Sequence, residues 1–144
     1  MNKLFQLSFV PRSTDFALLL LRFWLGLTLF FNHGLAKVLH HAQFSGMLPD
    51  PLGIGAHANL ILIVLAEVVA SALVVIGVAT RFAALVVSIE MAVAFFLVHH
   101  RALSGAGSGE LAFLYLAGFL TIVFAGGGRF VLCNKSNAPA DNAS

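Results

Sequence analysis

The sequence predicts an all-α integral membrane protein, a four-helix bundle with both termini in the cytoplasm. Composition is the first observation behind this class. Of the 144 residues, 60% are hydrophobic and only 10% are charged, whereas soluble domains are about 45–50% apolar and about 25% charged. The second observation is that apolar stretches recur along the chain. The first of them, at residues 16–39, is long enough to cross the ~30 Å hydrocarbon core as a helix.

This first helix has its polar residues along one side. At 100° per residue, the members of this stripe fall within roughly 80° of one another; they are Arg22, Gly26, Phe30, His33 and Lys37. The other sides are almost wholly Leu, Phe and Trp. We therefore expect lipid to contact the apolar sides and the rest of the protein to cover the stripe.

Three further apolar stretches predict helices at 58–79, 82–100 and 110–125. The second and third helices are joined by a tight antiparallel turn at Thr80 and Arg81. The third and fourth are joined by a flexible loop at 101–109. Together with the first helix, these stretches give the four spans of the predicted bundle.

Residues 40–57, between the first two helices, include two prolines and three glycines. Because these residues interrupt helices, the segment is expected to be a loop. Its many apolar residues indicate that it lies on the outer membrane face or dips back into it.

The chain is divided by composition into three parts. Residues 1–15 are expected to form a cytoplasmic lead-in, residues 16–130 the transmembrane domain, and residues 131–144 a polar, disordered tail. The first apolar stretch is too long for the apolar region of a signal peptide and is expected to stay as a membrane anchor. The single cysteine, Cys133, excludes an internal disulfide and is interpreted as an incidental thiol.

Lysine and arginine are distributed unevenly between the two sides of the predicted bundle. Five lie on the side of the termini and two on the opposite side: Lys3, Arg12, Arg81, Arg129 and Lys135 against Lys37 and Arg101. Because cytoplasmic loops hold the excess of these residues, both termini are placed in the cytoplasm. The formal net charge of +2 comes from scattered residues, which excludes a nucleic-acid-binding protein.

Three ionisable residues fall inside the predicted spans: Arg22, Glu67 and Glu90. A charge at the centre of a span costs about 2.5–3.5 kcal/mol on insertion scales, so none of them is expected to face lipid. At 1.5 Å per residue, Arg22 lies about 9 Å from the cytoplasmic side, Glu67 about 18 Å and Glu90 about 12 Å. These depths predict an internal polar network in which the guanidinium bridges both carboxylates. Two interpretations stay open: a latch that fixes helix packing, and a binding or proton-handling site.

A second polar group gathers at the outer ends of the helices: His33, Lys37, His99, His100 and Glu110. Hydrogen bonding to a quinone carbonyl or a lipid headgroup, structural capping, and ligation of haem or a metal are the alternatives. The histidines lack a specific metal-ligand spacing, and Lys37 would repel a cation, so no metal site is assigned and haem is disfavoured.

These residues resemble the DoxX family of membrane proteins. The resemblance covers about residues 16–130 and is based on several elements in their expected order: the run from Arg22 through His33-Gly34 to Lys37, Glu67 followed by Gly77, Thr80-Arg81 and Ala83-Ala84, then Ala94 to His99, Glu110, and Gly126 to Phe130. It implies a four-helix bundle in a bacterial inner membrane. Some relatives take part in quinone-coupled sulfur oxidation, as the DoxD subunit of thiosulfate:quinone oxidoreductase, and others in membrane oxidoreductase complexes that answer oxidative stress.

The function expected from these observations is an accessory or quinone-interacting subunit of a membrane oxidoreductase system. The sequence has no recognisable redox-cofactor motif, so any such role needs a bound quinone or a partner. Membrane lipids, and either partner subunits or further copies of the chain, are the expected partners. The alternative is a non-enzymatic assembly or packing subunit of a larger membrane complex, in which the buried charges are latches.

Overall fold

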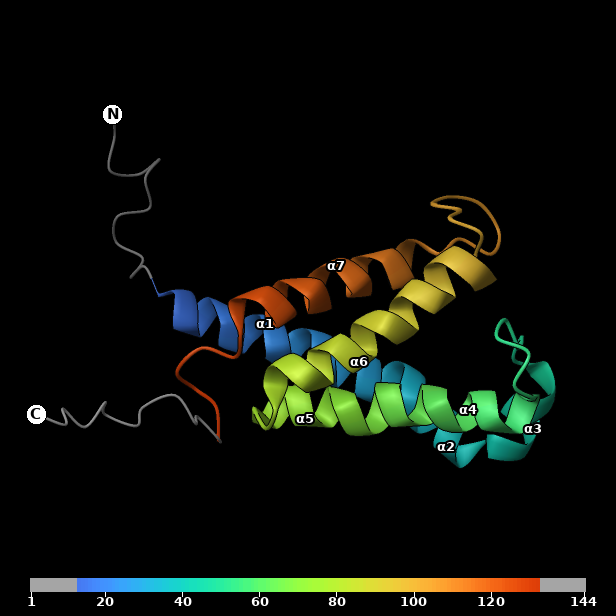
Figure 1. Cartoon of the computed structure of the whole chain (residues 1–144), viewed down its shortest axis with the longest axis horizontal. Coiled ribbons are helices and arrows are strands. Elements are labelled where there is room, and N and C mark those ends of the chain that lie inside the picture. The colour runs from blue at the N-terminus through green and yellow to red at the C-terminus, as the bar shows by residue number, and fades with distance from the viewer. Residues whose placement is uncertain (1–12, 133–144) are drawn as a thin grey trace, which may run out of the picture.

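A computed structural model describes residues 13–132, which form helices and, within that range, no strand (Figure 1). The elements are α1 Thr14–Leu29, η1 Phe30–Gly34, α2 Leu35–Leu39, α3 His41–Met47, α4 Ala56–Val64, η2 Leu65–Ala70, α5 Ser71–Ile76, α6 Thr80–Val93, η3 Ala94–Val98 and α7 Glu110–Ala125, where η marks a π-helical segment. Residues 1–12 of the expected lead-in and the tail from Cys133 onward lie outside the described residues.

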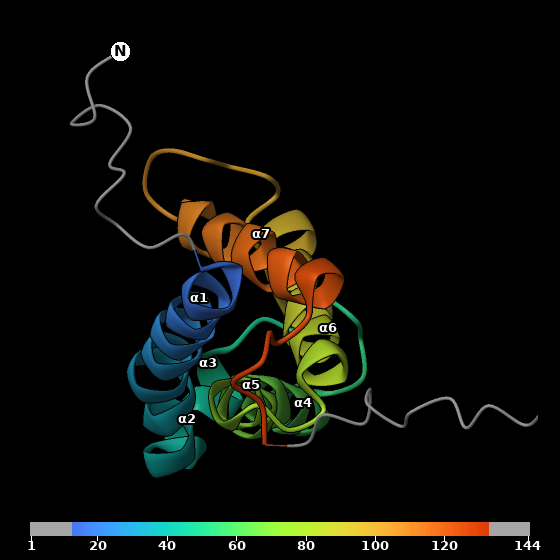
Figure 2. The same cartoon turned by 90° about the vertical axis from the view of Figure 1, so that its left-hand side faces the viewer.

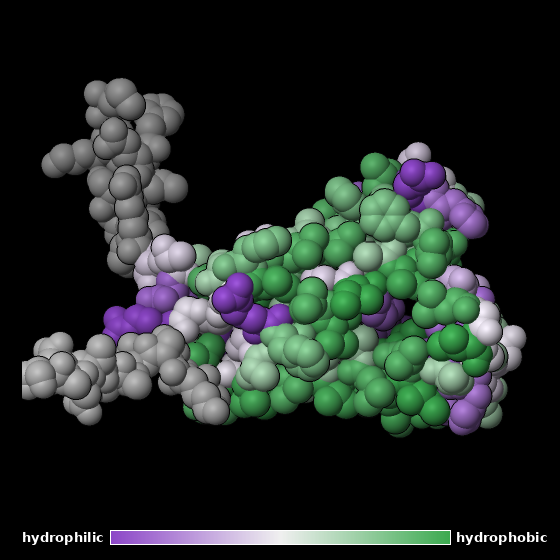
Figure 3. Space-filling view, in the orientation of Figure 1, coloured by the Kyte–Doolittle hydropathy of each residue, from purple (hydrophilic) through white to green (hydrophobic). Residues whose placement is uncertain are grey.

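The described residues include three helices long and apolar enough to cross a membrane: Thr14–Leu39, Ala56–Ile76 and Thr80–Val98. The fourth helix, α7, is apolar but has 16 residues and is therefore about 24 Å long. Large apolar side chains cover much of the outside of these helices (Figure 3), as expected where lipid is the solvent. The prediction of an all-helical membrane protein is confirmed.

The first and second long helices begin two residues earlier than predicted, at Thr14 and Ala56, and the other differences lie at the turn before the third helix and at its end. The turn between the second and third long helices lies at residues 77–79, because Gly77 and Ala79 adopt left-handed conformations with φ of 81° and 46°. The third helix therefore begins at Thr80, and His99 and His100 follow its end.

The prediction that residues 40–57 form only a loop is wrong. Residues His41–Met47 form the short helix α3. Both prolines, at 49 and 51, and two of the three glycines, at 53 and 55, come after it. They prevent a helix only in the segment from 48 to 55.

The core lies where α6 and α7 pack together against α1 and α5. Its buried apolar side chains come from these four helices and from η2: Leu29, Ala70, Val74, Ala83, Ala84, Val87, Met91, Tyr115, Phe119 and Ile122. Gly26 brings α1 close to α5, since a Cβ at this position would lie 3.1 Å from the carbonyl oxygen of Ser71. As predicted, the stripe of the first helix is turned toward protein: Arg22 and Gly26 are buried, and Phe30, His33 and Lys37 are partly buried.

Arg22 fixes the end of the molecule at which the described chain begins and ends. Its guanidinium donates to the carbonyl oxygens of Gly127 at 2.5 Å, Phe130 at 2.8 Å and Val75 at 3.4 Å. The segment after α7 thereby crosses this end of the bundle (Figure 2). The backbone N–H of Arg129 also donates to Asp15 Oδ1 at 3.0 Å, which ties the same segment to the start of α1.

Replacing this guanidinium should destabilise the protein. Arg22→Met leaves the carbonyl oxygens of Gly127 and Phe130 without their donor, and we expect a loss of about 2–4 kcal/mol in the free energy of unfolding. Thermal melting of the detergent-solubilised protein, followed by circular dichroism, measures it. Arg129→Gln is the matched control, because that side chain is exposed. Equal melting temperatures for both variants would contradict the assigned role of Arg22.

Candidate functional site

A cavity of about 500 Å³ opens in the half of the molecule away from Arg22. Here the ends of α6 and α7 diverge from those of α3 and α4 (Figure 1), and the surface is hollowed between them (Figure 3). Most of the lining side chains are apolar, among them Leu29, Ala66, Val86, Met91, Ala94 and Ala112. An apolar cavity with few polar groups is the usual form of a small-molecule site.

The central polar contact of the wall is an ion pair between the first two long helices. Lys37 Nζ lies 2.5 Å from Glu67 Oε2, and the two side chains are only 12% and 5% exposed. Both residues line the cavity. Because each charge is shielded from solvent, each depends on the other for compensation.

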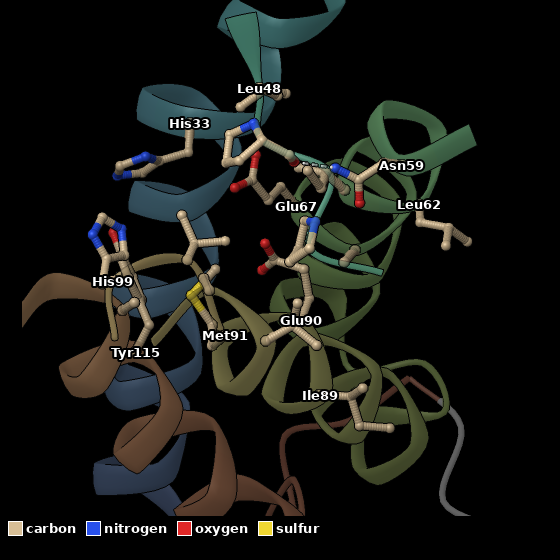
Figure 4. A pocket seen from close by; sticks show the side chains of 18 of the residues that line it. His33, Leu48, Asn59, Leu62, Glu67, Ile89, Glu90, Met91, His99 and Tyr115 are labelled. Carbon is tan, nitrogen blue, oxygen red and sulfur yellow. Dashed lines mark hydrogen bonds between the residues drawn. The ribbon is translucent and has the colours of Figure 1, made fainter. Parts of the chain in front are cut away.

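Glu90 lies in the same cavity and has no such partner. Its Oε2 atom is buried without a hydrogen-bond donor among the described residues. Figure 4 shows the carboxyl groups of Glu67 and Glu90 facing the same space between the helices. Buried polar atoms normally have a partner, so Glu90 has an unused hydrogen-bonding atom available to a molecule in the cavity.

The opposite wall is formed by His33, His99 and Tyr115 (Figure 4). The rings of His33 and Tyr115 meet edge to face, with centroids 5.9 Å apart. His99 Nδ1 lies 2.7 Å from the carbonyl oxygen of Gly107. Since a carbonyl oxygen only accepts, Nδ1 is the donor in this contact.

Asn59 positions the segment that covers the outer end of the cavity. It is buried, and its Nδ2 donates to the carbonyl oxygen of Pro49 at 2.8 Å. Asp50 folds the same segment by accepting from the backbone N–H groups of Ile54 and Gly55 at 3.2 and 2.7 Å. The segment is therefore held in place by side-chain hydrogen bonds.

Each long helix has one π-helical segment, and all three lie at this cavity. His33 is in η1, Glu67 is in η2, and His99 directly follows η3. Such segments are rare and often occur at functional sites, where they change the direction of the side chains that follow. Gly34 allows η1 to approach η2, since a Cβ there would lie 2.9 Å from the carbonyl oxygen of Glu67.

The cavity also reaches the lipid-facing side of the molecule. Leu62 on α4 and Ile89 on α6 line it and are nonetheless 50% and 58% exposed. The helix that contains Leu62 packs on α6 through η2 and α5 more than through α4. A membrane-dissolved molecule can therefore reach the cavity between these helices.

The structure combines members of the two predicted polar groups in one cavity and leaves the other members outside it. Five of the predicted residues line one cavity: Glu67 and Glu90 from the internal group, and His33, Lys37 and His99 from the outer group. Arg22 does not meet the two glutamates and binds backbone carbonyl oxygens instead. His100 and Glu110 are exposed and do not line the cavity.

Tyr115 and Asn59 are site residues that the sequence analysis missed. Tyr115 is the only tyrosine in the chain and lies within the apolar α7, where a phenol needs a polar neighbour. Asn59 lies in the first turn of α4, where it was indistinguishable from an ordinary polar residue near a helix start. Within residues 13–132, no three His, Cys, Asp or Glu side chains lie close enough to hold a metal ion.

Comparison with known proteins gives a family and one relative. A model of the DoxX family matches residues 17–100, a range that includes every polar cavity residue named above except Tyr115. An uncharacterised protein of Haemophilus influenzae is 36% identical over 119 residues, which are 74% of this chain and 81% of that protein. No solved structure matches the chain.

The close approach at Gly34 gives a prediction about the cavity wall. In Gly34→Ala, the new Cβ would lie 2.7 Å from Val68 Cγ2 and 2.9 Å from the carbonyl oxygen of Glu67, so the two helices must separate. We expect a loss of about 1–3 kcal/mol in stability, measured by thermal melting in detergent. Gly46→Ala in α3 is the control, since nothing lies within 4 Å of its added Cβ. Unchanged melting of Gly34→Ala would show that the helices do not meet here.

Proposed function

The chain belongs to the DoxX family of membrane proteins, and we propose that it is a quinone-interacting subunit of a membrane oxidoreductase system. In this proposal the cavity between the long helices binds the quinone ring. The observation that supports it most strongly is a lipid-accessible, mostly apolar cavity in which an ion pair and an unpartnered carboxyl group are buried together.

The apolar wall suits an aromatic ring that is dissolved in the membrane. A quinone has two carbonyl oxygens, which need hydrogen-bond donors once they leave water or lipid headgroups. Lys37 can donate from the N–H groups that Glu67 does not use, and the Tyr115 hydroxyl and the His33 ring can also donate. The cavity therefore offers a polar contact for the oxygens and an apolar surface for the ring.

The chain is proposed to act together with other proteins. Its sequence has no recognisable redox-cofactor motif, so the electrons that reduce or oxidise a quinone are assigned to a partner subunit. We place the chain in a bacterial inner membrane with four spans and both termini in the cytoplasm, following the distribution of Lys and Arg. The cavity then lies in the outer half of the bilayer.

A non-enzymatic assembly subunit is the competing proposal. The Arg22 contacts favour it, since they close one end of the bundle without using a ligand. A packing subunit, however, gives no reason for a carboxyl oxygen of Glu90 that is buried in a cavity without a hydrogen-bond partner. The cavity thus favours the quinone-interacting protein over the assembly subunit.

The proposal predicts that quinone stays with the protein during mild extraction. Lipid extracts of protein purified in mild detergent, analysed by mass spectrometry, should contain quinone. The double variant Lys37→Met with Glu67→Leu removes both charges together, which usually leaves folding intact, and should lose the quinone. Glu110→Gln, an exposed glutamate outside the cavity, should keep it.

Two results would contradict this proposal. Wild-type protein without quinone, arriving with stoichiometric partner subunits, would favour the assembly subunit. A double variant that folds normally and retains wild-type quinone would show that the quinone binds elsewhere. Glu67→Gln alone is less informative, because it leaves Lys37 buried and uncompensated and is expected to lower the yield of folded protein.

A further inference from the structure

We infer that Glu90 holds a proton inside the cavity and donates it in a hydrogen bond to an oxygen atom of the bound quinone. This neutral carboxyl group, rather than the ion pair of Lys37 and Glu67, is then the contact that makes quinone binding depend on pH. The inference rests on the proposed function and adds the residue and the protonation state through which the site holds its ligand. It concerns binding alone and requires no electron transfer.

The cavity has one more carboxyl group than its lysine can compensate. Lys37, Glu67 and Glu90 all line it, and Lys37 Nζ lies 2.5 Å from Glu67 Oε2. This contact is the only ion pair within residues 13–132. A charge on Glu67 is therefore compensated by a bonded cation, whereas a charge on Glu90 would not be.

The surroundings of Glu90 favour its neutral form. Its Oε2 atom is buried without a hydrogen-bond partner among the residues that the structure describes, and most of the cavity wall is apolar. Figure 4 shows the carboxyl groups of Glu67 and Glu90 facing the same space. Burial of an uncompensated carboxylate is costly, and a second carboxylate nearby adds repulsion. A proton on Glu90 removes both costs.

The other ionisable side chains of the wall do not take this role from Glu90. Five of them line the cavity: His33, Lys37, Glu67, His99 and Tyr115. The His33 ring packs edge to face on Tyr115, and His99 Nδ1 lies 2.7 Å from the carbonyl oxygen of Gly107. None of the five supplies a partner for Glu90 Oε2.

A neutral carboxyl group is a suitable contact for a quinone oxygen. Its O–H group donates one hydrogen bond, which the carbonyl oxygen of a quinone accepts. Glu90 directly follows Ile89, which lines the cavity and is 58% exposed on the lipid-facing side. The donor is thus next to the opening through which a membrane-dissolved ring would enter.

Binding through this proton has a definite pH dependence. The protonated acid donates to the quinone oxygen, whereas a carboxylate only accepts hydrogen bonds and would repel that oxygen. Affinity is therefore greatest while Glu90 keeps its proton, and it falls as the pH rises through the titration of this group. Because one proton is involved, the loss approaches about tenfold for each further pH unit.

The first experiment detects the proton without any quinone. Dicyclohexylcarbodiimide is an apolar reagent that reacts with protonated carboxyl groups. The acid gives its proton to a nitrogen of the reagent, its oxygen adds to the central carbon, and rearrangement leaves a stable N-acylurea. The full chain in lipid nanodiscs is treated and digested, and the adducts are mapped by mass spectrometry. We expect an adduct on Glu90 that decreases as the pH is raised, and none on the ion-paired Glu67.

The second experiment measures the hydrogen bond to the ligand. A short-chain benzoquinone with a fully substituted ring is titrated against the full chain in nanodiscs at several pH values, and binding is followed by calorimetry. The wild type should lose affinity by about tenfold per pH unit once Glu90 ionises. Glu90→Gln replaces the acid by an amide that donates at every pH, so this fall should disappear. Glu110→Gln makes the same change on an exposed residue outside the cavity and should keep the wild-type profile.

The outcomes separate this inference from the proposal beneath it. If the wild type binds quinone without a fall at high pH, or forms no adduct on Glu90, the inference is overturned and the quinone site stands. An adduct on Glu90 in a protein that binds no quinone overturns the proposed function, and the hydrogen bond with it. A fall that persists in Glu90→Gln overturns the assignment of the donor to Glu90. If Glu90→Gln does not fold, the adduct and the wild-type profile decide the question.

Discussion

The ion pair between Lys37 and Glu67 is the contact that organises the outer half of this molecule. It joins the first long helix to the second through two side chains that are only 12% and 5% exposed, so each residue requires the other. Gly34 permits the close approach of the two helices next to the pair. Lys37 is bonded to Glu67, and Glu90 is left in the cavity with a buried oxygen atom that has no hydrogen-bond partner within the described residues.

Buried ionisable side chains have different partners at the two ends of the bundle. At one end the Nη1 and Nη2 groups of Arg22 donate to backbone carbonyl oxygens of the segment after α7 and of α5, which closes that end, although its Nε has no partner within the described residues. At the other end the helices diverge around a cavity, and one acid has no partner within the described residues. Arg22 does not line the cavity, whereas Glu90 does, so only the second end has room for a ligand.

Much of the fold followed from the sequence, because the apolar stretches and the stripe of the first helix have the period of a helix. The pairing of the charges did not follow. The sequence showed Arg22, Glu67 and Glu90 at neighbouring depths. It could not show that the segment after α7 folds back and offers the carbonyl oxygens of Gly127 and Phe130 to Arg22. The π-helical segments also change the rotation of residues beyond Phe30, so a constant 100° per residue could not predict that Lys37 meets Glu67. Tyr115 joins the site through the rotation of α7, which tertiary packing determines.

The most direct test of the cavity as a quinone site is photoaffinity labelling with an azido-quinone, followed by mass spectrometric mapping of the modified residues. The account predicts labels on cavity residues such as Met91 and Tyr115, with labelling suppressed by excess unmodified quinone. Labels confined to lipid-exposed residues such as Trp24 and Phe124, unaffected by that competitor, would show that the quinone only dissolves in the surrounding lipid. That result would contradict the account.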